Sequence, residues 1–254
     1  MKTAVLFTET KLFGKPYWCI NTPMAEYWYD PQGGGFARLI DSEGLDWISY
    51  VEGPPPLSYR GIPNLQIYRG GSFEGIFHPG YTTCKSNFKI HRDGHVSVNC
   101  VSVVRKEWTC RWDFYSDHAV CTILSGVEPG CAFLYEGTPG GDPFDGNQIY
   151  MLLPGGERWY FSNTANNKRC LPAELAPTRV AFGRDGVNRL LVYNYYGEKV
   201  GICQYSVYNA LTVFGFGRES EPAISKFPSQ CWIAFLPLNS TWESIKFSTK
   251  QEEA

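Results

Sequence analysis

The sequence predicts an all-β protein with very little helix: a large antiparallel sandwich of two sheets, of the supersandwich or jelly-roll kind. Three observations carry this prediction. Helical periodicity is scarce, short alternating segments follow one another along most of the 254 residues, and tight-turn signals separate them. Roughly twelve to sixteen strands of this kind need two packed sheets to bury their apolar faces.

The first half of the chain reads as a series of hairpins. Residues 36–40 and 46–50 flank Asp41-Ser-Glu-Gly, and residues 88–91 and 95–100 flank Arg92-Asp-Gly. Asp-Gly favours a tight hairpin because both positions tolerate positive φ. Later strands meet at Ser116-Asp117 and follow Glu128-Pro-Gly, so residues 88–136 are predicted to form a meander of about five strands.

The second half repeats this style. Residues 179–182 and 189–193 flank Arg184-Asp-Gly, and further apolar segments follow up to residue 236. Only residues 171–176 and 206–211 are predicted as short helices. Strands of one kind lie on both sides of each loop rich in proline or glycine, so residues 1–254 are predicted to form a single domain.

The composition of the chain limits the kinds of partner that it is expected to bind. The net charge is −2 and the pI is near 6.1, with no basic stripe that would favour nucleic acid. No apolar run approaches the ~18 residues of a membrane span, so no membrane association is expected. The N-terminal apolar run is too short for a signal peptide, which predicts a soluble, cytoplasmic chain unless a leader was removed. The sequence leaves a monomer and a homodimer open.

Nine cysteines occur without any Cys-x-x-Cys pair, so zinc-ribbon and thioredoxin motifs are absent. Several lie in apolar strands, where a thiol packs as a small hydrophobe, and buried free thiols are expected. No calcium, zinc or nucleotide motif is present, and neither a metal nor a cofactor is expected.

Residues 59–87 combine an arginine, an imidazole, a phenol and amides with glycines and prolines that favour loops. We expect His78 and Tyr81 to move protons and Arg60 to hold a carboxylate. Asn64 and Asn87 are neutral donors for substrate hydroxyls. In the alternative interpretation, Arg60 and His78 only cap buried loop carbonyls.

Further candidates lie at strand ends. Asp113 and His118 face each other across a predicted hairpin, where a carboxylate would orient the imidazole for catalysis. Glu136 ends an apolar strand beside a glycine-rich loop, a setting that suits a base with a raised pKa. Arg218 follows Phe-Gly-Phe-Gly and is a candidate partner for Glu136 or for substrate. A solvated turn and a structural ion pair remain open for these residues.

Aromatic residues are abundant and include eight tryptophans. Sugars present C–H faces that stack on such rings, while their hydroxyls take hydrogen bonds. Tyr27 and Trp28, within Tyr-Trp-Tyr-Asp, form the best platform candidate, although any one ring can equally belong to the core. A carbohydrate ligand is the partner that this composition favours.

The segments Arg60-Gly-Ile-Pro-Asn-Leu, Phe77-His-Pro-Gly-Tyr and Trp112-Asp-Phe-Tyr resemble those of galactose-mutarotase-like proteins, a large β-sandwich group that also includes polysaccharide lyases and sugar epimerases. The resemblance implies that a histidine and a carboxylate handle protons at the ring oxygen and the anomeric hydroxyl. His78 would correspond to the histidine, and Glu136 is a candidate for the carboxylate. Tyr81, His78, Arg60 and Asn64 would match the lyase relatives.

Three function classes follow. The leading hypothesis is a carbohydrate lyase, or a related proton-transfer enzyme, that acts on an acidic sugar with His78 or Tyr81 as base and Arg60 on the carboxylate. Sub-alternatives are a glycoside hydrolase that uses Glu136 with Asp113, and a sugar epimerase. The competing class is a non-catalytic glycan-binding or structural β-sandwich module.

Overall fold

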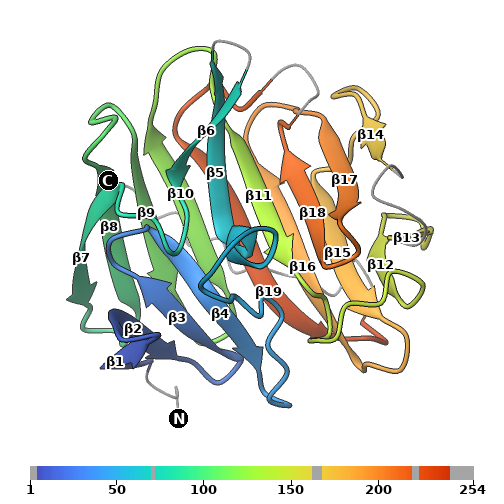
Figure 1. The fold of residues 1–254 in the computed structure, drawn as a ribbon, viewed down its shortest axis with the longest axis horizontal. Helices are drawn as coiled ribbons and strands as arrows, with labels where there is room; N and C mark the ends of the chain where they lie inside the picture. The colour runs from blue at the N-terminus through green and yellow to red at the C-terminus, as the bar shows by residue number, and fades with distance from the viewer. Residues whose placement is uncertain (1–4, 70–71, 162–167, 219–222, 241–254) are drawn as a thin grey trace.

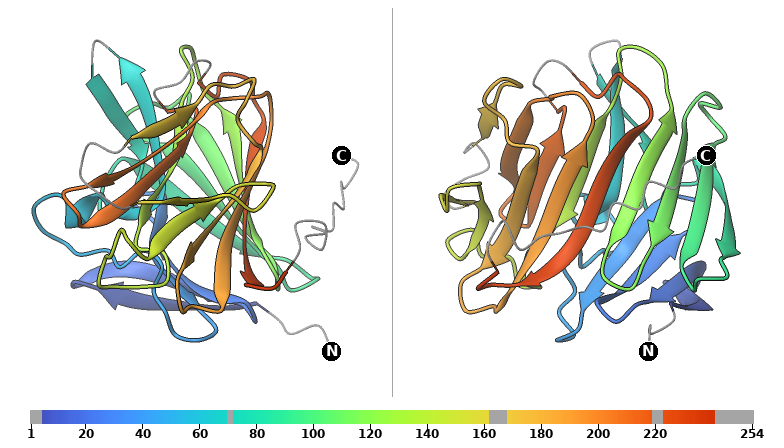
Figure 2. Two further views of the ribbon diagram at one scale, coloured as in Figure 1. Left: turned by 90° about the vertical axis from the view of Figure 1, so that its right-hand side faces the viewer. Right: turned by 180° about the vertical axis from the view of Figure 1, so that it is seen from behind.

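The computed structural model describes residues 5–69, 72–161, 168–218 and 223–240. These residues form two large antiparallel sheets, with the single 3-10 turn Leu57–Tyr59 as the one helical element described. The predicted all-β sandwich is confirmed. Figure 1 shows one sheet in front of the other, and the left panel of Figure 2 shows both layers edge-on.

The ten-stranded sheet has the order β1-β2-β3-β4-β5-β11-β18-β17-β14, and β6 pairs with β5. Its strands are β1 (Leu6–Leu12), β2 (Lys15–Asn21), β3 (Ala25–Asp30), β4 (Gly35–Asp41), β5 (Gly61–Arg69), β6 (Ser72–Phe77), β11 (Ala132–Gly137), β14 (Arg169–Leu171), β17 (Ile202–Val207) and β18 (Leu211–Phe216).

The nine-stranded sheet has the order β13-β12-β15-β16-β19-β10-β9-β8-β7. Its strands are β7 (Cys84–Ile90), β8 (Val96–Ser102), β9 (Thr109–Phe114), β10 (Ala119–Ser125), β12 (Ile149–Leu152), β13 (Arg158–Tyr160), β15 (Arg179–Arg184), β16 (Arg189–Tyr196) and β19 (Ser229–Pro237).

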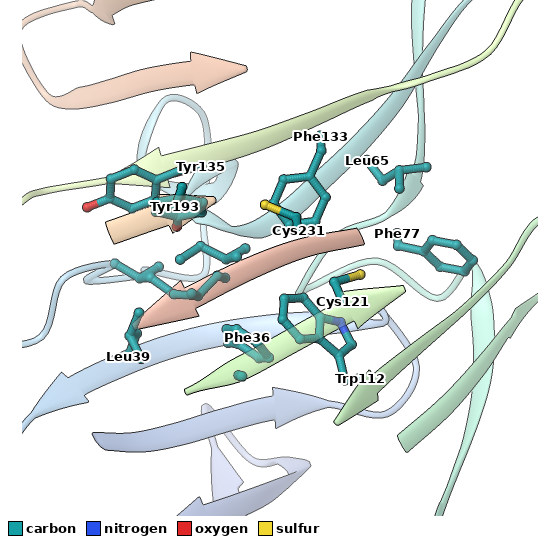
Figure 3. Close-up of a cluster of buried hydrophobic side chains, with 14 of the residues drawn as sticks. Phe36, Leu39, Leu65, Phe77, Trp112, Cys121, Phe133, Tyr135, Tyr193 and Cys231 are labelled. Carbon is teal, nitrogen blue, oxygen red and sulfur yellow. The ribbon is translucent and has the colours of Figure 1, made fainter. Parts of the chain in front are cut away.

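The core lies between the two sheets and is strongly aromatic. The ring of Phe36 from β4 contacts Trp112 from β9, with ring centroids 4.4 Å apart, and Phe133 from β11 packs on the same cluster. Figure 3 shows these rings from both layers facing one another. Since strand side chains alternate, the residues between inward-facing positions point to the outer faces. On β11 these outward residues are Ala132, Leu134 and Glu136.

Most predicted hairpins are confirmed. Arg92-Asp-Gly joins β7 to β8, and Ser116-Asp117 lies between β9 and β10. The predicted meander over residues 88–136 is correct for its first four strands, which are neighbours in the nine-stranded sheet. The fifth strand, β11, instead crosses to the other sheet and lies between β5 and β18.

The two predicted helices are wrong. Residues 172–176 make a single turn, in which Leu175 and Ala176 donate to the Pro172 carbonyl, before β15 begins. Residues 206–211 form the tight end of the β17–β18 hairpin. In residues 206–211 the pairing of β17 with β18 overrides a local helical pattern, whereas the turn at residues 172–176 is not continued into a helix.

All nine cysteines lie within the described residues. Seven are free and buried, as predicted, and Cys170 and Cys203 form a disulfide between the paired strands β14 and β17. None of the described residues belongs to a helix that is long and apolar enough to span a membrane.

Candidate functional site

A buried polar cluster lies on the outer face of the ten-stranded sheet, with Glu136 at its centre. Only 4% of the Glu136 surface is exposed. Asn64 comes from the neighbouring strand β5, His78 from the loop after β6, and Arg218 from the residues after β18. Figure 1 shows β5, β11 and β18 side by side in the middle of the sheet.

The contacts of the Glu136 carboxylate are specific. Asn64 Nδ2 donates to Oε2 at 2.7 Å, and His78 Nε2 lies 3.9 Å from the same oxygen. Arg218 Nη1 lies 3.8 Å from Oε1. Burial raises the pKa of Glu136 to about 7, although the Asn64 hydrogen bond and the Arg218 charge oppose this rise. A carboxyl group with such a pKa is suited to exchange a proton near neutral pH.

His78 is fully buried and held in one tautomer. Its Nε2–H donates to the Tyr59 carbonyl at 2.6 Å, and its Nδ1 has no hydrogen-bond partner within the described part of the chain. Burial lowers the pKa of His78 to about 4, so the ring is neutral at neutral pH. Gly61 permits this packing, because a Cβ there would lie 2.5 Å from the Pro79 ring and 3.1 Å from His78 Nε2.

The loop that carries His78 is fixed by its backbone. The His78 amide donates to the Gly33 carbonyl at 2.7 Å. The Asp30 carboxylate accepts the Gly80 amide through Oδ2 at 2.7 Å and the amides of Gln32 and Gly33 through Oδ1. Asp30 thus joins the end of β3 to this loop. It is a positioning residue that the sequence analysis did not identify.

Tyr81 lies in the same loop, with its ring centroid 4.7 Å from that of His78. Burial, and next the negative charge of Glu136, raise the pKa of Tyr81. A base must lose its proton readily, and this environment opposes ionisation of the phenol. These surroundings do not favour Tyr81 as a proton-abstracting base.

The Arg60 guanidinium is occupied by protein acceptors. Its Nη1 donates to the Ser49 carbonyl at 2.7 Å and to the Asp142 carboxylate at 2.8 Å, and its Nη2 donates to the Ala210 carbonyl at 2.7 Å. The expected grip on a substrate carboxylate is not what these contacts provide. The alternative interpretation, in which Arg60 caps loop carbonyls, describes its geometry.

A cleft of about 720 Å³ opens beside this cluster, between Pro55, Pro56 and Tyr59 on one wall and residues 205–208 on the other. Glu136 does not line it. The connection runs through Arg218, whose guanidinium carbon lies 5.2 Å from the centroid of the Tyr205 ring. One side chain therefore spans the distance from the cleft to the buried carboxylate.

The structure separates two further candidates from the cluster. Asp113, on β9, accepts from Ser97 and Arg111, and His118 Nδ1 lies 2.7 Å from the Asp117 carboxylate while its ring stacks on Trp232. Both belong to the outer face of the nine-stranded sheet, on the far side of the core. The predicted hydrolytic pair of Glu136 and Asp113 is therefore wrong, and His118 cannot act with Glu136.

Three predicted sugar contacts also lie elsewhere. Asn87 is exposed on β7, at the edge of the nine-stranded sheet. Tyr27 is fully buried against Phe36 and Phe114 between the layers. Trp28 faces outward from β3 beneath Arg38 and does not line the cleft. The platform prediction failed because alternation along β3 sends its two tyrosines into the core.

The tyrosines that do line the cleft were missed. Tyr59 directly precedes Arg60, within the segment that the sequence analysis singled out. Tyr205 is in register with Val213 on β18, which in turn is in register with Glu136 on β11. That register depends on pairing between distant strands, which no local pattern reveals. Tyr208 lies in the hairpin turn that was predicted as helix.

Comparisons with known proteins address the fold. No protein-family model and no curated protein matches the sequence. Among solved structures, a proposed mutarotase from Salmonella typhimurium is similar with a TM-score of 0.57 and 11% identity, over 91% of this chain and 94% of that one. A proposed aldose 1-epimerase from Escherichia coli K12 is similar with a TM-score of 0.53 and 8% identity, over 87% and 99% of the chains.

A galactose mutarotase-like protein from Clostridium acetobutylicum is similar with a TM-score of 0.53 and 10% identity, over 92% of this chain and 98% of that one. At these identities the likeness concerns the fold. It extends over nearly the full length of each chain. The chain therefore has the β-sandwich fold of galactose mutarotase-like and aldose 1-epimerase proteins, as the resemblance in its sequence implied.

Proposed function

We propose that the protein is an aldose 1-epimerase, which interconverts the two anomers of a reducing sugar, and that Glu136 transfers the proton. The observation that carries the proposal is a buried carboxylate with a pKa of about 7, placed beside an open cleft on a mutarotase-like sheet. A group that is part protonated at neutral pH can act as acid and as base.

The reaction needs one proton to move between two oxygens. Ionised Glu136 removes the proton from the anomeric hydroxyl, the C1–O1 bond becomes a carbonyl, and the bond from C1 to the ring oxygen breaks. The ring oxygen takes up a proton from Glu136 and becomes a hydroxyl. Rotation of the open aldehyde and the reverse steps on its other face give the second anomer, with no net proton change.

The neighbours of Glu136 support this role. Asn64 and His78 face Oε2 and fix the plane of the carboxylate, and Arg218 opposes Oε1. Asn64 Oδ1 is buried and has no hydrogen-bond partner among the described residues, so a group that entered the site would find an unused acceptor there. Because His78 is sealed and committed to the Tyr59 carbonyl, it acts on Glu136 rather than on the sugar.

Elimination at an acidic sugar finds no support in these contacts. The lyase mechanism requires a guanidinium for the carboxylate and a base with an accessible ionised form. Arg60 is bound to Ser49, Asp142 and Ala210, and the pKa of Tyr81 is raised by burial and by Glu136. The epimerase, which was a sub-alternative of the sequence analysis, needs neither group.

A second candidate function is glycan binding without catalysis. It is favoured by the closure of the site, because the side chain of Glu136 is only 5% exposed and that of Arg218 only 11%. In an enzyme, Arg218 would have to leave the carboxylate edge when the sugar arrives. In a binding module it would stay in place, and only the tyrosine-lined cleft would contact the ligand.

The test is the rate of anomer exchange, followed by polarimetry and by two-dimensional exchange NMR on a panel of neutral, phosphorylated and uronic aldoses. The enzyme hypothesis predicts acceleration by the protein and a drop of about 10²–10⁴ in Glu136→Gln, the range of general acid–base catalysis. Glu9→Gln, the same change at an exposed position on β1, should keep full activity. Binding of sugars without acceleration would overturn the epimerase and support the binding module.

A further inference from the structure

The cleft beside Glu136 has an aromatic and uncharged lining. Tyr59 and Tyr208 expose 39% and 74% of their surfaces, and Tyr205 forms the floor on the side of Arg218. No charged side chain is found among the described residues that line it. Rings with phenolic tips offer stacking faces and hydrogen-bond groups together, which suits a neutral sugar better than a phosphate or a uronate.

Tyr208 occupies a backbone position that disfavours it. The β17–β18 turn is closed by the Ala210 amide, which donates to the Val207 carbonyl at 2.9 Å. Its two central residues, Tyr208 and Asn209, have φ values of 49° and 51°. Such turns prefer Asn or Gly, and a bulky residue with positive φ is an outlier. Because the Tyr208 ring is mostly exposed, core packing does not explain it, and its place in the cleft lining leaves the ring available to a ligand.

Arg60 fixes the separation of the two walls. Its backbone follows directly from Tyr59 on one wall, and its Nη2 binds the Ala210 carbonyl in the Tyr208 turn on the other wall. A third contact, from Nη1 to the Ser49 carbonyl, holds the guanidinium in place. The cleft is therefore shaped before any ligand arrives, which lowers the entropic cost of binding.

The distance from Glu136 to the turn exceeds one sugar ring. Tyr205 lies two strands from Glu136 in the register, which is about 9.5 Å at ordinary strand spacing, and Tyr208 is roughly 10 Å further along β17. The cleft volume of about 720 Å³ also falls within the ~300–1,000 Å³ that is typical of ligand pockets. A ligand that reaches both the carboxylate and Tyr208 must be longer than one pyranose.

We infer that the substrate is a reducing oligosaccharide, whose terminal sugar reacts at Glu136 while a second, neutral sugar unit stacks in the cleft between Tyr59, Tyr205 and Tyr208. This inference rests on the proposed function and narrows its substrate class. The second unit takes no part in the chemistry. Its binding energy favours longer substrates over free monosaccharides.

The experiment compares anomer-exchange kcat/KM for glucose and galactose with that for maltose, cellobiose and lactose. Tyr208→Asn removes the ring and supplies a residue that the turn accepts, so the hairpin should remain intact. Phe13→Asn is the matched control, since Phe13 is another exposed ring at positive φ, in the β1–β2 turn outside the cleft. Tyr59→Ala provides an independent change on the opposite wall.

At least one disaccharide should exceed both monosaccharides in kcat/KM. The disaccharide-to-monosaccharide ratio should fall roughly 3- to 10-fold in Tyr208→Asn and in Tyr59→Ala, as expected for the loss of one stacking ring, and stay constant in Phe13→Asn. A ratio near one in the unaltered protein, or a ratio that neither cleft variant changes, overturns the oligosaccharide inference and leaves the epimerase standing. Absence of exchange with every sugar overturns the proposed function itself.

Discussion

Glu136 illustrates how burial converts an ordinary carboxyl into a group that titrates near neutral pH. The residue lies on the outer face of a sheet, where a carboxylate would normally be solvated, yet Asn64, His78 and Arg218 surround it and only 4% of its surface is exposed. Desolvation outweighs the nearby arginine because Arg218 Nη1 stays 3.8 Å away, beyond hydrogen-bond length.

Folding stability should depend on pH through Glu136. The unfolded carboxyl loses its proton near pH 4.5, whereas the folded one keeps it until about pH 7. Stability is therefore highest below pH 4.5 for this group and declines as pH rises towards 7, by on the order of 3 kcal/mol. Urea unfolding at pH 5 and pH 8 should show a smaller decline in Glu136→Gln than in the unaltered protein; parallel behaviour would contradict the buried state.

His78 contributes in the opposite direction. Its folded pKa is lowered to about 4 from an ordinary 6.5, so its contribution is complete above pH 6.5 and is lost as pH falls towards 4. Both the unaltered protein and Glu136→Gln contain His78. The difference between their pH-dependent stabilities therefore reports the Glu136 carboxyl alone.

The hydrogen bond from the Asn64 amide should lower the pKa of the Glu136 carboxyl. Asn64→Leu keeps the side-chain volume and removes the donor to Oε2, so the pKa of Glu136 should move further upward. The limb of the pH–rate profile that reports Glu136 would shift to higher pH, and kcat/KM at pH 7 would fall about tenfold, as for one lost charge-assisted hydrogen bond. An unchanged pH profile would show that Asn64 has only a packing role.

At the scale of elements, Gly61 at the start of β5 controls the His78 loop. Gly61→Ala would force a methyl group against the Pro79 ring, at 2.5 Å, and towards the imidazole. We expect a loss of roughly 1–3 kcal/mol in thermal or urea unfolding, together with lower activity. Adding Pro79→Ala removes the obstructing ring, and the double variant should recover part of the loss. Strict additivity of the two changes would refute this steric account.

Arg60 joins three segments: the loop after β4, the loop that contains Asp142, and the β17–β18 turn. Arg60→Met should cost about 2–4 kcal/mol because it leaves buried carbonyls without donors. Arg60→Lys should retain part of the stability and much of the activity. If Arg60 instead held a substrate carboxylate, Arg60→Lys would lose activity on acidic sugars while unfolding at an unchanged urea concentration.

The sequence predicted the positions of single strands and turns better than it predicted which strands pair with each other. Asp-Gly turns and alternation located most of the hairpins, because those signals are local. The transfer of β11 from the expected meander into the other sheet depends on pairing with β5 and β18, whose paired residues lie 66 to 83 positions away in the sequence. The site was only part predictable for the same reason. His78, Asn64 and Glu136 were identified as chemical types, whereas Tyr205 and Asp30 acquire meaning only through register.

At the scale of the whole molecule, aromatic contacts across the layers hold the sandwich together. Phe36 and Phe133 from one sheet meet Trp112 from the other, and all three rings are buried. Any breathing motion that separates the sheets must break this cluster. Large motions of that kind should be rare, and they should occur together with exposure of the other core residues.

The buried thiols can report when the two sheets separate, because thiol reactivity can be measured over time. Six of them belong to the core cluster between the layers, where a thiol reagent such as Ellman's reagent reaches them only when the interior opens, whereas Cys19 is 6% exposed and lies outside that cluster. Without denaturant, colour development should be slow and should follow the unfolding rate, whereas in concentrated urea the same groups should react within the mixing time. Staggered release of single thiols would instead map the order in which regions of the sandwich come apart, so the native chain can report its own opening with no engineered label.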